Sequence, residues 1–331
     1  MGNLSERLSP AFVEAAFKRE MEGDTGASWV DRICTQPYPV SAAQRIYEDL
    51  FDVDPVEESL DLNAVNDLID RRITLTNQEY VQALNIFDQT MRRDATGQVM
   101  QRVQDAVRRW REHPAKLVST LLTSGASASH WSGDNSQYFF DTQHADGSSG
   151  ELSNIVSVTL SGLPIPTDRL GTTTAPSGET LAWCVLKAAQ RFASFKDTAG
   201  EPMFDPSRFM KGSPDPVPLV VMVPTTLMAA ASMAASEDNF PGGGSNFLKG
   251  YNVIVAANQR LDASWTDKFA VAIGDGKCFI RQQERAPFLS SYIGPGSAEY
   301  EQNGERHSWI YRGTYAYGYG RWERICLVDM D

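Results

Sequence analysis

The sequence predicts an α+β fold, and three observations carry that prediction. Apolar strand-like runs alternate with helical patterns between residues 180 and 260, a long helical pattern occupies residues 76–112, and β-prone runs follow one another from residue 265 onward. A chain of 331 residues can form one large domain or two medium-sized ones.

A short amphipathic helix is predicted to begin at Pro10. Ser9 can cap its first amides, and proline suits the first helical position because its missing N–H would have no partner there. The apolar stripe of this helix is Phe12, Val13, Ala16 and Phe17. Glycines within residues 23–26 end the helix, so the stripe must dock either on its own domain or on a neighbouring molecule.

The most acidic part of the chain is residues 48–70, which contain no Lys or Arg. Its carboxylates are Glu48, Asp49, Asp52, Asp54, Glu57, Glu58, Asp61, Asp67 and Asp70. A solvated loop is the simplest interpretation of such a run.

The longest helical pattern covers residues 76–112. Thr76 and Glu79 form a capping box, in which each side chain bonds a backbone amide near the other residue. Pro114 is expected to end this helix, and a second helix is predicted from there to Leu122. The apolar stripe consists of Tyr80, Leu84, Phe87, Met91, Met100, Val103, Val107 and Trp110. The arginines of the same helix are Arg92, Arg93, Arg102, Arg108, Arg109 and Arg111.

Buried strands and helices alternate farther along the chain. Residues 125–178 are rich in Gly, Ser, Thr and Pro, and they precede a predicted helix at 179–195. Unbroken apolar runs at 219–223 and 251–256 predict buried strands, with a helix at 224–235 between them. The β-prone runs of the tail are 269–273, 277–282, 308–315 and 322–328.

Candidate metal ligands gather in one stretch, where His130, Asp134, Asp141 and His144 lie within fifteen positions. Metal sites draw their ligands from rigid elements, whereas this stretch is rich in Ser and Gly. The alternative is a turn in which Asp141 binds backbone amides.

Other catalytic signals are weak. Residues 274–277, Gly-Asp-Gly-Lys, lack the spacing of a phosphate loop, and Asp-Gly between two β-prone runs predicts a hairpin turn. Cys184 lies beside Trp183 inside a predicted helix and is expected in the core. No catalytic, cofactor-binding or metal-binding residue is therefore predicted, and no enzyme activity is expected.

The composition gives further limits. The scattered cysteines Cys34, Cys184, Cys278 and Cys326 predict reduced thiols from a cytosolic site of synthesis. The N-terminus has no apolar run typical of a signal peptide, and no run of about 18 apolar residues could span a bilayer.

A resemblance to a known family begins at residues 138–144, Tyr-Phe-Phe-Asp-Thr-Gln-His. They are similar to the Phe-Phe-Asp-x-x-His-Pro segment of the Mu-like prophage major head subunit (gpT-like) family, with Ala145 in place of the proline. Further segments resemble the family in the same order, at residues 28–33, 221–224, 250–255, 279–281, 311–313 and 317–322. Residues 34–75 depart from the family because they are far more acidic.

This resemblance implies the Hong Kong 97-type capsid fold and a major capsid protein of a tailed bacteriophage, which assembles into an icosahedral shell around double-stranded DNA. The implied parts are an N-terminal arm (1–33), an extended loop (34–75), a peripheral domain with a long spine helix and the start of a sheet (76–175), an axial domain (176–264) and return strands that complete the peripheral domain (265–331).

The implied partners are copies of the chain itself, in pentamers and hexamers, together with portal and scaffold proteins and a decoration protein as a further candidate. Packaged DNA would be contacted non-specifically, because a net charge of −12 argues against a basic DNA-gripping face. No cofactor and no membrane contact are expected. The protein would be made in the host bacterial cytoplasm and end in the virion capsid.

Opposite charges in neighbouring segments suggest how copies touch. The acidic segment would lie across the arginine helix of the next subunit; alternatively, the arginines pair within their own helix or face DNA. The predicted intersubunit contact residues are Phe12, Phe17, Asp54, Glu57, Glu58, Asp61, Asp67, Arg92, Arg93, Arg102, Arg108 and Arg109.

Two other functions fit parts of the sequence. An encapsulin-like shell would package enzymes in place of DNA, and a hydrolase with a dispersed active site would form only a small oligomer. Nuclease-resistant DNA inside purified particles would distinguish a phage capsid from an encapsulin-like shell. Gel filtration would distinguish a shell protein, which elutes as large assemblies, from a hydrolase, which elutes as a small oligomer.

Overall fold

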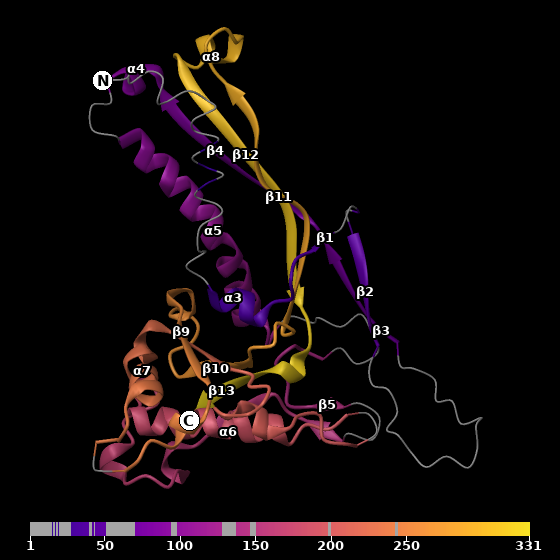
Figure 1. Cartoon of the computed structure of the whole chain (residues 1–331), viewed down its shortest axis with the longest axis vertical. Helices are drawn as coiled ribbons and strands as arrows, with labels where there is room; N and C mark the ends of the chain where they lie inside the picture. The colour runs from indigo at the N-terminus through magenta and orange to yellow at the C-terminus, as the bar shows by residue number, and fades with distance from the viewer. Residues whose placement is uncertain are drawn as a thin grey trace, which may run out of the picture.

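The computed structural model describes residues 15, 17, 19, 28–39, 42, 44–50, 70–93, 98–127, 137–145, 150–197, 200–241 and 244–331. Two β-sheets organise these residues. Figure 1 shows a long upright sheet above a second sheet that is flanked by helices. None of the helices in the described ranges is long and apolar enough to cross a membrane.

The long sheet has the strand order β1-β11-β12-β4. Its strands are β1 (Tyr38–Pro39), β11 (Phe279–Ile293), β12 (Arg306–Tyr319) and β4 (Gln78–Phe87). β11 and β12 form a long antiparallel hairpin with α8 (Ala298–Gln302) between them, and β4 pairs antiparallel with β12 over its whole length. One face of this sheet packs against α5 (Gln98–Ser124).

The helix predicted over 76–112 is wrong in its first part. Asp70–Thr76 is strand β3 and Gln78–Phe87 is strand β4, so Thr76 and Glu79 form no capping box. Burial in β4 alternates, with the side chains of Tyr80, Leu84 and Ile86 facing the α5 core. The pairing with β12, which lies far away in the sequence, overrides the local helical signal. Helix begins only at α4 (Asp88–Arg92).

The predicted helix end at Pro114 is also wrong, because α5 continues through this proline to Ser124. Proline supplies no N–H to the ladder of the helix, which weakens it at that point. Residues beyond the proline, including Val118 and Leu122, are buried in the core, and this packing stabilises the continuous helix.

The second sheet has the order β7-β13-β10-β8-β9 and holds the larger core. Its strands are β7 (Ile155–Val158), β13 (Ile325–Met330), β10 (Lys268–Ile273), β8 (Leu219–Val223) and β9 (Val253–Ala257). The helices α6 (Gly178–Ala193) and α7 (Met228–Ser236) pack beside it. The predicted strand at 219–223 is confirmed, every residue of it being buried, and so is the helix predicted at 179–195.

Two short pieces lie outside these sheets. A ribbon of β2 (Gln44–Leu50) and β3 (Asp70–Thr76) projects beside the long sheet, as Figure 1 shows, and β5 (His144–Ala145) pairs with β6 (Glu151–Leu152). Helix α3 (Ser28–Ile33) lies near the lower end of α5.

The two sheets are joined by two adjacent crossovers. Residues 274–278 lead from β10 to β11, and residues 320–324 lead from β12 to β13. The hairpin predicted at 274–277 is therefore wrong, since β10 and β11 belong to different sheets. The run predicted as one strand at 322–328 is a 3-10 turn (Trp322–Arg324) followed by β13.

A buried hydrogen bond fastens α5 to the second sheet. The side-chain amide nitrogen of Asn258 donates to Ser119 Oγ at 2.8 Å. The side-chain oxygen Oδ1 of Asn258 accepts from the backbone amide of Arg260 at 3.1 Å. Asn258 is 7% exposed. It thus links the lower half of the helix to the turn that follows β9.

We predict that Asn258→Ala lowers the free energy of unfolding by about 1–3 kcal/mol, because it removes a buried donor and a turn cap together. Urea denaturation of the unassembled subunit measures the change. Asn303→Ala, at an exposed position, is the matched control and should change it by less than about 0.5 kcal/mol. Equal effects of the two variants would contradict this role of Asn258.

Candidate functional site

The arginines of α5 differ in how far they are neutralised. Arg108 lies 2.9 Å from Asp105 and 3.8 Å from Glu112 on its own helix. Arg102 and Arg109 are exposed and have no acidic side chain within 4.0 Å among the described residues. The pairing expected as an alternative therefore applies to Arg108, whereas Arg102 and Arg109 have no such partner within the described ranges.

Other predicted contact residues are only partly placed. Arg93 is exposed after α4, and the side chain of Arg92 lies outside the described residues. Phe12, Asp54, Glu57, Glu58, Asp61 and Asp67 also lie outside the described residues.

Phe17 docks on its own chain. Its ring stacks on that of Tyr311 with 4.0 Å between centroids and 16° between planes, and its side chain is 2% exposed. Trp309 and Trp110 belong to the same buried cluster. The N-terminal stripe was expected to dock either on its own domain or on a neighbouring molecule, and Phe17 docks on its own domain.

The stretch considered for metal binding contains the alternative turn. One carboxylate oxygen of Asp141 accepts from the amides of Thr142 (2.6 Å) and Gln143 (3.1 Å), and the other from Tyr138 (3.2 Å). His144 is buried and stacks on Trp322 at 3.8 Å. Within the described ranges, no group of three or more His, Cys, Asp or Glu could hold a metal ion, and His130 and Asp134 lie outside those ranges.

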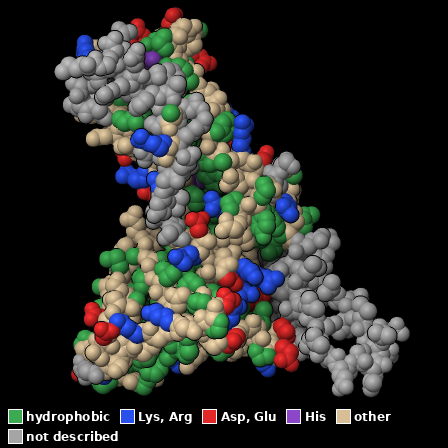
Figure 2. Space-filling model, in the orientation of Figure 1, with side chains coloured by type: hydrophobic (Ala, Val, Ile, Leu, Met, Phe, Trp, Pro, Cys, Tyr) green, Lys and Arg blue, Asp and Glu red, His purple; other side chains and the backbone are tan. Residues whose placement is uncertain are grey.

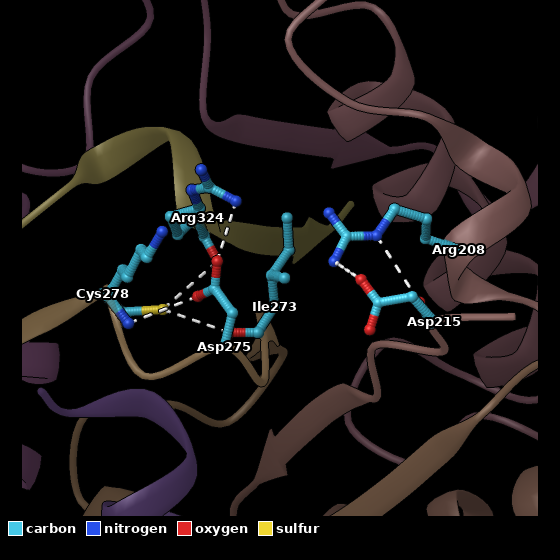
Figure 3. Close-up of polar contacts among 7 residues, drawn as sticks. Arg208, Asp215, Ile273, Asp275, Cys278 and Arg324 are labelled. Carbon is cyan, nitrogen blue, oxygen red and sulfur yellow. Dashed lines mark hydrogen bonds and ion pairs between the residues drawn. The ribbon is translucent and has the colours of Figure 1, made fainter. Parts of the chain in front are cut away.

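The junction between the sheets is held by charge and by backbone bonds. Figure 3 shows the Arg324 guanidinium beside Asp275, at 2.8 Å, with both side chains largely buried. The amides of Gly320 and Arg321 donate to the carbonyls of Cys278 (2.9 Å) and Lys277 (3.1 Å). The crossovers thus form one unit. Figure 3 also draws the separate ion pair of Arg208 with Asp215.

The four cysteines are buried and free. Burial, reinforced by the nearby Asp275 carboxylate, raises the pKa of the Cys278 thiol well above its ordinary value. Burial likewise raises the pKa of Cys184 to about 12. Such thiols stay protonated, so they are core residues and not nucleophiles.

The base of the β2–β3 ribbon holds functional contacts that were not predicted from the sequence. The Tyr47 hydroxyl donates to Gln282 Oε1 at 2.9 Å, and Gln282 is fully buried. The guanidinium of Arg45 lies 5.2 Å from the Tyr47 ring centroid. These contacts fix where the ribbon leaves the long sheet. An alternation of polar and apolar residues at 72–76 was the available signal, although the capping-box pattern beside it suggested a helix.

The surface charge of the described residues is mixed. On the face drawn in Figure 2, blue and red side chains lie interspersed over the lower sheet and its helices. The described residues of that face therefore form no extended basic surface of the kind that grips a nucleic acid backbone.

Comparison with known proteins gives the family that the chain resembles. The family model of the Mu-like prophage major head subunit gpT matches residues 8–164. The chain is thus similar, over just under half of its length, to the Mu-like major head subunit family. It is a major capsid protein of a tailed bacteriophage, with the virion capsid as its location, and the family is a structural one. No curated protein sequence matches it significantly.

Solved capsids share the fold of this head subunit. The bacteriophage JBD30 capsid protein is 18% identical with a TM-score of 0.52, covering 77% of this chain and 99% of its own. The cyanophage P-SCSP1u capsid protein is 13% identical with a TM-score of 0.51, and the match covers 91% of this chain and 86% of the cyanophage chain. The capsid protein of a native GTA particle is 10% identical with a TM-score of 0.52, and the match covers 93% of this chain and 91% of the GTA chain. The expected Hong Kong 97-type fold is thereby confirmed.

A partly buried histidine lies in the contact between α5 and the long sheet. His113 Nδ1 lies 2.7 Å from the Tyr315 hydroxyl, and its ring packs edge-on against Tyr80. Burial lowers the pKa of His113 below its ordinary value of 6.5, and the charges of Lys116 and Arg260 lower it further. The folded subunit therefore binds this proton less readily than the unfolded chain.

We predict that the free energy of unfolding falls as the pH drops through about 6.5. Below this pH His113 binds a proton in the unfolded chain, whereas its lowered pKa keeps it neutral in the folded subunit, so protonation favours unfolding. In His113→Gln this fall should be smaller, while the two proteins should respond alike between pH 7.5 and 8.5. Denaturant titrations of the unassembled subunit at several pH values measure it. An unchanged pH dependence in the variant would exclude His113 as the cause.

Proposed function

We propose that this head subunit assembles with copies of itself, as pentamers and hexamers, into an icosahedral shell that encloses double-stranded DNA. The match of residues 8–164 to the head subunit family carries the proposal. The projecting β2–β3 ribbon supports it, because a two-stranded ribbon is marginal in water unless something packs on it. We assign the subunit no catalysis and no cofactor. The matches reported above support neither an encapsulin-like shell nor a hydrolase.

We further propose that residues 1–33 act as an N-terminal arm, 34–75 as an extended loop, 76–175 with 265–331 as the peripheral domain, and 176–264 as the axial domain. Portal and scaffold proteins, and a decoration protein, would be partners of the assembled shell. DNA would be contacted without sequence specificity, in keeping with the net charge of −12.

The acidic segment 48–70 is proposed to lie across α5 of the neighbouring subunit. Arg102 and Arg109 are its best partners, because Asp105 and Glu112 already neutralise Arg108. Exposed ion pairs contribute only about 0–1 kcal/mol each, so charge would set register and specificity. Apolar burial would supply most of the cohesion.

Purified wild-type protein should form closed particles of uniform diameter in negative-stain images, and particles from phage-producing cells should contain nuclease-resistant DNA. A small oligomer at every protein and salt concentration would contradict the assembly. Shells that carry protein cargo without DNA would favour the encapsulin-like alternative.

Reversing charge in the acidic segment, by Asp61→Lys with Asp67→Lys, should raise the protein concentration needed for assembly several-fold at low salt, because attraction becomes repulsion. Light scattering across a salt series measures this. Adding Arg102→Glu and Arg109→Glu should restore assembly, whereas Arg108→Ala alone should have little effect. Identical assembly of all four proteins at every salt concentration would contradict the contact.

A further inference from the structure

We propose that a pocket at the base of the β2–β3 ribbon binds a small amphipathic carboxylate, and that the bound molecule clamps the ribbon against the rest of its own subunit. The pocket belongs to a single chain, so the inference goes beyond the proposed assembly and does not depend on it. It rests on the walls of the pocket, on the charge and polarity of its lining, and on the way the ribbon meets the long sheet.

The pocket is enclosed by segments that lie far apart in the sequence. Its volume of about 280 Å³ is close to the lower end of the range of about 300–1,000 Å³ that is typical of small-molecule sites. Two lining residues come from the ribbon, two from the segment that follows α3, and four from β11 and the crossovers. A molecule in the pocket would therefore touch three parts of the fold at once. The lining residues are Thr35, Tyr38, Tyr47, Ile73, Lys277, Ile280, Gly320 and Arg321.

One wall of the pocket is fixed by backbone hydrogen bonds. The amide of Thr35 donates to the Phe279 carbonyl at 2.8 Å, which joins the segment after α3 to β11. The amide of Arg321 donates to the Lys277 carbonyl at 3.1 Å, which joins the two crossovers. Lys277 and Arg321 are thus held next to each other at the pocket. A wall that exists before the ligand arrives lowers the ordering cost of binding.

The polar groups at the pocket favour an anion. Lys277 is exposed, and its ammonium group has no carboxylate within 4.0 Å among the described residues. Thr35 Oγ1 accepts from the amide of Arg281 at 2.9 Å, so the hydroxyl hydrogen of Thr35 remains available to an acceptor. Within the described ranges, no Asp or Glu lines the pocket. A single carboxylate could accept from both the ammonium and the hydroxyl, and hydrogen bonds between charged groups are the strong ones.

The remainder of the lining is aliphatic or aromatic. Ile73 and Ile280 are buried, and they contribute aliphatic surface from the ribbon and from β11. The rings of Tyr38 and Tyr47 lie 5.8 Å apart between centroids, and Tyr38 is 42% exposed. An inorganic anion would leave these surfaces in water, whereas a carboxylate with a short apolar body would cover them. The lining thus favours an amphipathic acid.

The pocket lies where the ribbon meets the long sheet. The Tyr47 hydroxyl donates to Gln282 Oε1 at 2.9 Å, and Gln282 Nε2 donates to the Leu75 carbonyl at 3.5 Å. A two-stranded ribbon has little stability of its own in water. A ligand that packs on Ile73 while its carboxylate binds Lys277 would add a link between the ribbon and the crossovers. Such a link would make local opening of the ribbon rarer.

Calorimetric titration of the unassembled full-length subunit tests the site with simple probes. We expect 3-phenylpropionate and hexanoate to bind at one site per subunit. The matching alcohols, 3-phenylpropanol and hexanol, should bind about tenfold more weakly, because they lack the charge that Lys277 attracts. The amine 3-phenylpropylamine should bind more weakly still, since its charge is repelled.

Two variants, each with a matched control, locate the bound acid. Lys277→Gln should weaken the binding of both acids about five- to tenfold, because it removes a charge, whereas Lys187→Gln at another exposed lysine should leave binding unchanged. Tyr38→Ala should also weaken binding, because it removes a ring from the pocket. Tyr138→Ala removes a ring that is 41% exposed elsewhere and should have no effect. Urea denaturation without ligand should show that all four variants fold normally.

Hydrogen exchange tests the clamp. Saturating 3-phenylpropionate should slow the exchange of amides in β2 and β3 several-fold and leave those of α6 unchanged. The site would be overturned if neither acid binds, if the alcohols bind equally well, or if Lys277→Gln and Tyr38→Ala bind the acids like the wild type. Binding without slower exchange in the ribbon would overturn the clamp. None of these results depends on whether the protein forms shells, so failure of the proposed assembly would be seen separately.

Discussion

The pairing of β11 with β12 is the interaction on which the rest of the structure depends. This hairpin runs from Phe279 opposite Tyr319 to Ile293 opposite Ser308, and it carries β4 on one side and β1 on the other. Both of its strands continue through the crossovers into the second sheet. The pair Asp275–Arg324 lies at that junction, largely buried, where loss of one partner would leave an uncompensated charge.

The arrangement leaves the long sheet covered by α5 on one face and open along β4. Among the described residues, no further strand pairs with the outer side of β4 or joins the β2–β3 ribbon, so both present open β edges at the periphery. In a protein that acts alone such edges invite aggregation, and natural proteins usually block them. In a head subunit the same feature suits an assembly in which identical neighbours complete each other.

The charges of the molecule have a similar division. Arg108 is engaged within its own helix, whereas Arg102 and Arg109 face outward, so the basic character of α5 is smaller than its arginine count implies. In the proposed contact with the acidic segment, Arg102 and Arg109 are therefore better candidate partners than Arg108. Phe17, by contrast, lies in the subunit's own core against Tyr311, and it stabilises the monomer.

The local sequence determined two kinds of element: strands in which every residue is buried, and helices or turns that are capped by a neighbouring side chain. The strand at 219–223, the helix after Ser177 and the turn at Asp141 all follow from residues within a few positions of one another. The segment resemblance likewise identified the family without any knowledge of the fold. Tertiary structure alone decided that residues 78–87 pair with β12, that α5 passes through Pro114, and that residues 274–277 join two sheets. The reason is physical: each of these outcomes depends on hydrogen bonds or apolar contacts with residues far away in the chain, and these outweigh the weak local preferences.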